Sequence, residues 1–193
     1  MSSHEKNNKF IKRYENIKSM LEAREIIFDL DENPTSFSEL KKIFKNKVFD
    51  SKNDIDDKTM VFMPLELKLG VGNLKNVLNK LDINDAKNAI VIIEDSATPA
   101  AKSNISLLLK NKTYITVFNY DEIGVNILKH EYQPKSFKVL NSKEIQKEIT
   151  PFYSCNKLPG MLLRDPVSKW LNLKKHQIVR IEREDGIVYK QIR

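Results

Sequence analysis

The sequence predicts an α+β protein, in which an α/β domain is followed by a small domain with a mixed sheet. Helical and strand-like patterns alternate along the first two thirds of the chain, as expected of an α/β layer. The last segment reads as strand, Asp-Gly turn and strand, which is typical of a β-hairpin. A chain of 193 residues can bury a core in one large or two small domains.

The first expected element is an amphipathic helix at 9–24, because Phe10, Tyr14, Ile17 and Leu21 recur at helical spacing. The elements expected after it are a short helix at 37–44, an acidic loop at 50–58, a strand at 59–65, a helix at 73–82, a strand at 89–95, a helix opening at Thr98 and Pro99, and a strand at 114–118. The run at 89–95 is apolar without alternation, which indicates a strand covered on both faces.

The second region begins where the composition shifts. We expect an N-terminal domain at 1–129, a linker at 130–141 containing Pro134, and a C-terminal domain at 142–193. The elements expected in the C-terminal domain are a helix at 143–149 capped by Ser142, a second short helix, and a hairpin turning at Asp185-Gly186. The second helix is expected to be capped by Asp165, with Pro166 at its first position and with Val167, Trp170 and Leu171 on one face. A small sheet covered by one helix buries little surface alone, so we expect this domain to be stabilised by contact with a partner.

Charge and composition narrow the function classes. The chain carries a net charge of +7, and residues 164–193 hold eight Lys and Arg against four Asp and Glu. This excess is as compatible with a solvated basic face as with a nucleic-acid surface. Apolar runs are too short to span a bilayer, and one cysteine, Cys155, provides no internal disulfide. We therefore expect a soluble intracellular protein.

Three separated blocks carry a family resemblance. They are LPGMLLRDPVSKWLNLKKHQIVRI at 158–181, HEYQP at 130–134 and AIVIIEDSATPAAKSNI at 89–105. Together they resemble the fifth subunit of eukaryotic-type multisubunit DNA-directed RNA polymerases, in its assembly module, its linker and its jaw domain. Archaeal members consist of the assembly module alone, so the jaw makes this chain similar to eukaryotic members or to those of large DNA viruses.

The resemblance implies a non-catalytic subunit with no cofactor and no catalytic or metal-binding residue of its own. Its C-terminal module would dock on the largest subunit and contact other polymerase subunits, and its jaw, with nuclease-like layering, would lie beside downstream duplex DNA. The residues implied in docking or in the fold are Leu158, Pro159, Asp165, Pro166, Val167, Trp170, Lys174, Lys175, Gln177 and Val179. The residues implied to face DNA are Thr98, Pro99, Ala100 and Lys102. Each of them also has a purely structural explanation, such as a helix cap or a core position.

The chain departs from the family pattern at several positions. Ala100 replaces the usual serine of the jaw loop, and His176 stands where the family usually has glycine. A residue with a Cβ adopts a positive φ less readily than glycine, so the basic turn is expected to differ. Gly160 makes the backbone after the Leu-Pro pair more flexible. The turn that joins the last two strands is shorter than is usual in the family.

Two alternatives belong to other functional classes. Asp54, Asp56 or Asp57, followed by Glu66-Leu67-Lys68, has the order of a metal-dependent nuclease, in which carboxylates hold Mg²⁺ and a lysine steadies the phosphate. That motif is short and common, so it is weak evidence. The other alternative is a stand-alone DNA-binding protein, which the near-neutral charge before residue 164 disfavours. A polymerase subunit would work in the nucleus of a cell, or in a cytoplasmic factory or the virion of a virus, without a membrane and without forming homo-oligomers.

Overall fold

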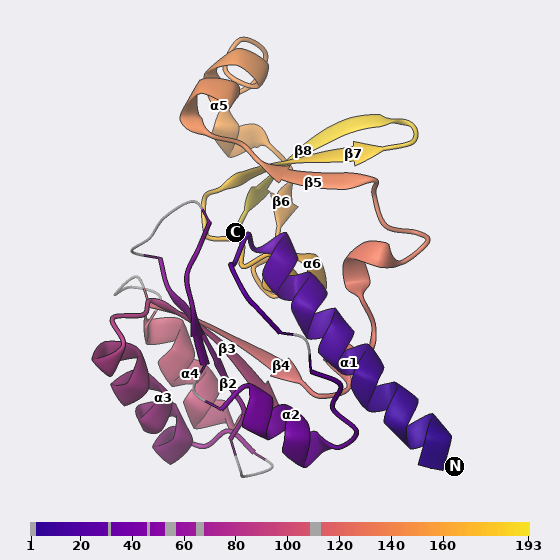
Figure 1. Ribbon diagram of the computed structural model, residues 1–193. Helices are drawn as coiled ribbons and strands as arrows, with labels where there is room; N and C mark the ends of the chain where they lie inside the picture. Colours follow the sequence, from indigo (N-terminus) through magenta and orange to yellow (C-terminus); the bar gives the residue numbers. More distant parts are fainter. Residues whose placement is uncertain (1–2, 31, 46, 53–56, 65–67, 109–112) are drawn as a thin grey trace. The chain divides into compact units, whose positions relative to one another are not determined.

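The computed structural model describes residues 3–30, 32–45, 47–52, 57–64, 68–108 and 113–193. The chain divides into two compact units, Met1–Val125 and Asn126–Arg193. Each unit contains a four-stranded mixed sheet, so the predicted α+β class with a mixed sheet near the C-terminus is confirmed (Figure 1).

The first unit consists of four α-helices, four strands and a 3₁₀ turn among its described residues. In chain order these are α1 (Ser3–Ala23), α2 (Phe37–Ile43), β1 (Lys47–Phe49), β2 (Thr59–Phe62), α3 (Val71–Ile83), β3 (Asn88–Ile93), α4 (Pro99–Leu108), β4 (Tyr114–Asn119) and η2 (Glu122–Gly124). The predicted helices and strands of this region are all present. The short strand β1 was not predicted, because its three residues give too brief an alternation to be recognised.

The sheet of the first unit has the strand order β1-β2-β3-β4. Strand β1 runs antiparallel to β2, while β2, β3 and β4 are parallel. The helices α3 and α4 are the crossover connections of these parallel strands, as parallel pairing requires. Met60, Ala89 and Ile115 are aligned across the three strands.

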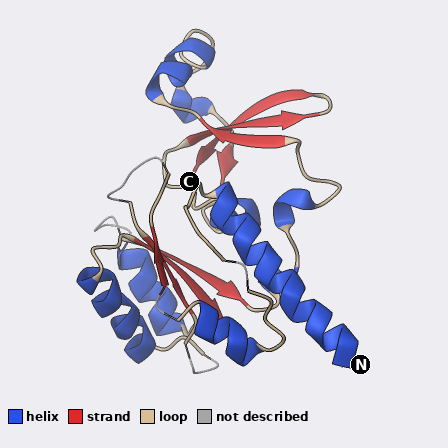
Figure 2. Cartoon of the chain, viewed as in Figure 1, coloured by secondary structure: helices blue, strands red, loops and turns tan. Residues whose placement is uncertain are grey.

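Both faces of this sheet are buried, as the apolar run at 89–95 predicted. One face packs against α3 and α4 in a cluster that includes Ala89, Val91 and Ile93. The alternate residues Ile90 and Ile92 are fully buried on the opposite face. Figure 2 shows α1 and α2 on that side of the sheet, and the ring centroids of Tyr14 in α1 and Phe44, the C-cap residue of α2, lie 6.0 Å apart.

The helix α1 is fixed to the end of β4 by its polar residues. The Arg13 guanidinium lies 4.2 Å from the centroid of the Tyr120 ring, and its Nε donates to the Tyr120 carbonyl oxygen at 3.0 Å. Its Nη2 pairs with the Asp121 carboxylate at 3.0 Å. Asn16 donates to the Ile123 carbonyl oxygen at 2.8 Å. Burial raises the pKa of the Tyr120 hydroxyl to about 12, so this phenol stays neutral near pH 7.

The second unit builds its sheet from four short strands. Its elements in chain order are η3 (Ile127–Lys129), β5 (Ser136–Val139), α5 (Ser142–Glu148), η4 (Cys155–Lys157), β6 (Gly160–Met161), α6 (Pro166–Trp170), β7 (Ile178–Arg183) and β8 (Gly186–Ile192). The strand order is β5-β7-β8-β6, with β6 parallel to β8 and the other pairs antiparallel.

Two apolar clusters cover the two faces of this second sheet. Val179 and Ile181 belong to the cluster that includes Val167 of α6. Ile178, which points to the opposite face, belongs to the cluster of Ile149 and its neighbours at the end of α5. Each cluster is smaller than the cluster under α3 and α4.

Three details of the second unit differ from expectation. The segment expected as a linker at 130–141 contains β5, whose Phe137 and Val139 pair with β7. The cap of α5 is Asn141, not Ser142, because the Asn141 side chain accepts from the Glu144 backbone in a capping box.

The hairpin also turns one residue earlier than predicted. The residues outside the pairing are Glu184 and Asp185, whereas Gly186 already pairs with Arg183. Gly186 has a φ of 144°, which is unfavourable for a residue with a Cβ.

Candidate functional site

The residues predicted for docking separate into buried and accessible groups. Five are buried or serve as a helix cap, namely Leu158, Asp165, Val167, Trp170 and Val179. Pro159, Pro166 and Lys175 are exposed, and Lys174 and Gln177 are half-buried. Leu158, Val167, Trp170 and Val179 are buried and have a role in folding, whereas Asp165 is half-buried and caps α6.

The helix α6 begins as predicted. Asp165 accepts from the Val167 backbone N–H at 2.9 Å, and Pro166 occupies the first helical position, where no hydrogen bond is lost. Trp170 is only 2% exposed, which identifies it as a core residue rather than a surface for stacking. This arrangement fixes the direction in which the chain enters the basic turn.

The basic turn at Lys174–Gln177 is held by its own side chains and by β8. The Gln177 side-chain oxygen accepts from the Lys174 backbone N–H at 2.7 Å. His176 adopts a φ of 71°, and its N–H donates to the Ile192 carbonyl oxygen at 2.9 Å. The turn therefore keeps the positive φ that glycine would supply, with a strained histidine in its place.

Arg193 closes the segment around the Leu-Pro pair. Its guanidinium donates to the carbonyl oxygens of Asn156 and Leu158, at 3.2 and 3.0 Å. A Cβ at Gly160 would lie 3.0 Å from the Arg193 Cδ, so the missing side chain makes room for the arginine. Gly160 thus has a packing role that the sequence did not indicate.

The residues predicted to face DNA lie at the start of α4. The Thr98 hydroxyl accepts from the Ala101 backbone N–H at 3.2 Å, as the predicted cap. Pro99, Ala100 and Lys102 are exposed. The Leu69 backbone holds this loop, since the Thr98 N–H donates to the Leu69 carbonyl oxygen at 3.0 Å.

The proposed nuclease motif is only partly within the described residues. Asp54, Asp56, Glu66 and Leu67 lie outside them. The Asp57 carboxylate accepts from the Asn88 side chain. Lys68 pairs with Asp95 at 3.4 Å, with both side chains largely exposed.

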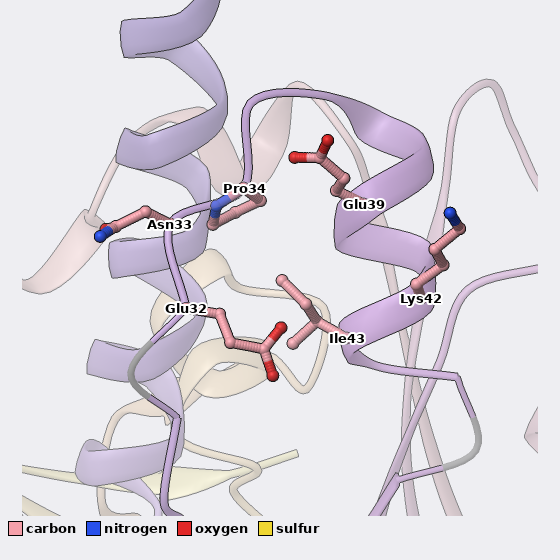
Figure 3. Close-up of a pocket in the computed structure, with 6 residues that line it drawn as sticks. All are labelled: Glu32, Asn33, Pro34, Glu39, Lys42 and Ile43. Atoms are coloured by element: carbon pink, nitrogen blue, oxygen red, sulfur yellow. The ribbon is translucent and has the colours of Figure 1, made fainter.

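A shallow cavity of about 250 Å³ lies beside α2 in the first unit. Its lining residues are Glu32, Asn33, Pro34, Glu39, Lys42 and Ile43 (Figure 3). Hydrogen bonds from Thr35 lower the pKa of the Glu39 carboxyl, because they favour the ionised form. Glu39 therefore acts as a helix-start acceptor, and none of the predicted site residues reaches this cavity.

The charge of the chain is distributed unevenly between the units. The first unit contains 19 Lys and Arg and 19 Asp and Glu, whereas the second contains 14 and 7. The whole net charge of +7 therefore belongs to residues 126–193. Within the described part of the chain, no group of three His, Cys, Asp or Glu side chains could hold a metal ion. No helix in that part is long and apolar enough to cross a membrane.

Sequence reasoning missed two features of the second unit. Arg164 and Arg193 were not singled out, although β-pairing brings both beside the basic turn. The exposed aromatic residues Phe152 and Tyr153, after α5, were also missed. Neither feature has a local signature, because exposure and long-range proximity depend on the complete fold.

Comparison with known proteins gives a consistent result. Residues 125–192 match the family described as RNA polymerase Rpb5, C-terminal domain. The chain is 30% identical over 135 residues to a Dictyostelium discoideum protein named DNA-directed RNA polymerases I, II, and III subunit rpabc1, covering 68% of each chain. It is 31% identical over 152 residues to the DNA-directed RNA polymerase subunit 5-like protein 1 of Arabidopsis thaliana, covering 76% of this chain and 71% of that one. The match to the Caenorhabditis elegans subunit RPABC1 is 29% identical over 133 residues and spans 62% of the relative.

These matches, on a two-unit α+β chain, define the class of protein as a non-catalytic subunit of a multisubunit DNA-directed RNA polymerase. The chain belongs to the Rpb5 family, RPABC1 in the names of its relatives. Its partners are therefore other subunits of a polymerase complex.

Proposed function

We propose that the second unit docks on the largest subunit of the polymerase and that the first unit lies beside the downstream duplex DNA. The observation that carries this proposal is the family match, which covers nearly the whole second unit and the segment containing the docking residues. The accessible residues Pro159, Pro166 and Lys175 are the ones that would make the docking contacts. Nucleotide addition would belong to the two largest subunits.

The contribution of the first unit to DNA contact is proposed to be weak. This unit carries no net charge, so it offers no general attraction for phosphates. The proposed local contact is at the start of α4, where Lys102 is exposed near the positive end of the helix. We expect DNA to be contacted within the complex and not by the isolated chain.

The location of the chain follows from that of its complex. We propose the nucleus if the chain is cellular, and the cytoplasmic factory or virion if it is viral. Fractionation that finds the chain apart from polymerase activity would contradict this part of the proposal.

The test is affinity purification of the tagged full chain from its own cells or infected host. We expect the two largest polymerase subunits in equal proportion with the chain. Pro159→Glu should reduce their recovery, whereas the matched control Pro151→Glu, at another exposed proline of the second unit, should not.

Two results would contradict the proposal. Recovery of the chain alone would remove the docking claim. Recovery with bare DNA, or divalent-metal-dependent cleavage of DNA lost in Glu66→Ala, would favour a DNA-binding protein or a nuclease instead. The Lys102→Ala variant, with Lys75→Ala as control, then tests DNA retention by the purified complex.

A further inference from the structure

The second unit has an edge where three basic segments meet. The segments are 157–165, 174–177 and 191–193, and we call them together the basic edge. The parallel pairing of β6 with β8 places Gly160 opposite Gln191 and Met161 opposite Ile192. The pairing of β6 with β8 therefore brings the segments together, while the basic residues themselves lie in the turns and the last residue beside these strands.

Hydrogen bonds continue this pairing into the flanking residues. The Arg193 N–H donates to the Met161 carbonyl oxygen at 2.8 Å, and the Leu163 N–H donates to the Arg193 carbonyl oxygen at 3.0 Å. The bond from His176 to Ile192 brings the basic turn to the same place. Arg193 is thus itself part of this bonding, and Arg164 and Lys175 are each next in sequence to a bonded residue, Leu163 and His176.

The charge of the basic edge is strongly one-sided. Its three segments contain five basic residues and one acidic residue. The basic residues are Lys157, Arg164, Lys174, Lys175 and Arg193. The acidic residue is Asp165, whose carboxylate already accepts the Val167 backbone N–H. All of the basic residues except Lys174 are exposed.

Apolar surface accompanies the charge. Leu162, between β6 and Arg164, is 51% exposed. Pro159, just before β6, is also exposed. Exposed apolar side chains among cations favour a protein partner, because protein interfaces combine an apolar centre with a polar rim. Binding to a nucleic-acid backbone depends mainly on the phosphate charges and would make less use of Leu162 and Pro159.

We propose that the basic edge binds an acidic segment of another polymerase subunit, with Leu162 and Pro159 covered by apolar residues of that segment. This inference rests on the proposed docking function and assigns it a surface and a partner chemistry. Arg164 and Arg193 become contact residues. Charge complementarity identifies the occupant, since a patch of five cations with one committed carboxylate attracts an anionic surface.

The experiment uses the tagged full chain and compares two double charge reversals. Arg164→Glu with Lys175→Glu alters the basic edge, and Lys143→Glu with Lys147→Glu makes the same charge change on the exposed surface of α5. At about 0.1 M salt we expect the first variant to recover at least about tenfold less of the largest subunits, because like charges would then face each other. The α5 control should recover them as the original chain does.

A milder pair keeps the test independent of folding. Arg164→Gln with Lys175→Gln should give an intermediate loss of subunit recovery. Recovery by this variant should also depend less on salt concentration than recovery by the original chain, since fewer charge pairs remain to be screened. Circular dichroism and thermal unfolding of each purified chain check that the fold is retained. A photoreactive amino acid placed at the position of Leu162 should cross-link to an acidic stretch of a polymerase subunit.

The outcomes separate this inference from the proposed function. If the original chain recovers no polymerase subunit, the proposed function fails. If both reversals recover subunits equally well, docking stands and the basic edge is overturned as its surface. If the basic-edge reversal keeps the subunits but lowers retention of DNA by the complex, the occupant is nucleic acid and the acidic-segment proposal is overturned.

Discussion

The two units of the chain differ in net charge and in the size of their apolar cores. The first unit has no net charge and buries a parallel sheet on both faces. The second unit carries a charge of +7 and covers its short strands with two small clusters. The first unit therefore has the larger apolar core, and one lost contact is a larger fraction of the apolar clusters of the second unit.

The largest expected effect is at a buried aromatic residue of the second unit. Trp170→Ala should lower the free energy of unfolding by about 3–5 kcal/mol, because a fully buried aromatic side chain is lost. Residue-resolved hydrogen exchange should show loss of protection at β7 and β8. Protection at β3 of the first unit should remain.

Ile90 provides a matched substitution in the first unit. Ile90→Ala, in the middle of β3, should cost about 2–5 kcal/mol and act on the first unit. Equal loss of protection in both units from either variant would show one cooperative core and would contradict the contrast drawn above.

The cap of α6 should give the next largest effect. Asp165→Ala removes the acceptor of the Val167 N–H and should cost about 0.5–2 kcal/mol, measured by urea unfolding. Asp165→Asn retains an acceptor oxygen and should cost less. A loss of the same size in Asp165→Asn would mean that charge, and not capping, is what matters at this position.

The basic turn offers a stabilising change. The φ of 71° at His176 costs conformational energy because histidine has a Cβ. His176→Gly should therefore raise the free energy of unfolding by about 0.5–1 kcal/mol. His176→Asn should give a smaller gain, because asparagine tolerates this region better than most residues. Thermal unfolding measures both, and destabilisation by glycine would contradict the strain.

Acid should weaken both units at their helix starts. The Lys138 ammonium and the Asn141 backbone lower the pKa of Glu144, and Thr35 does the same for Glu39 in the first unit. Because the pKa values are depressed in the folded state, this stabilisation is present above the ordinary value of 4.5 and is lost as pH falls through the folded values. Carboxyl NMR titration measures both groups.

A control variant checks the assignment to Glu144. Glu144→Gln keeps a capping oxygen but not the charge, so its stability should be flatter between about pH 5 and 3 than that of the original chain. An unchanged pH dependence would show that Glu144 does not contribute to acid sensitivity.

The sequence predicted the elements that have a strong local signature. The stripe of α1, the unbroken apolar run of β3 and the caps Thr98 and Asp165 were all found as expected. Strand β5 was missed because Pro134 suggested a break, although Phe137 and Val139 alternate with polar residues. The alternation was present but covers only four residues.

The candidate site was less predictable, because family motifs mark residues without saying whether they face inward. Val167 and Val179 are core residues, and the Gln177 side chain accepts a hydrogen bond within the basic turn. Arg193 has no motif, and its role depends on the missing Cβ of Gly160 more than thirty residues earlier. Such long-range packing cannot be deduced from local patterns.

We propose that the second unit, and not the first, attaches the chain to the polymerase. The most direct measurement is zero-length cross-linking of lysine to carboxylate groups in the purified complex, followed by mass spectrometry. We predict cross-links from Lys175 and Lys157 to carboxylates of the largest subunit. Cross-links to that subunit confined to lysines of residues 1–125 would contradict the claim.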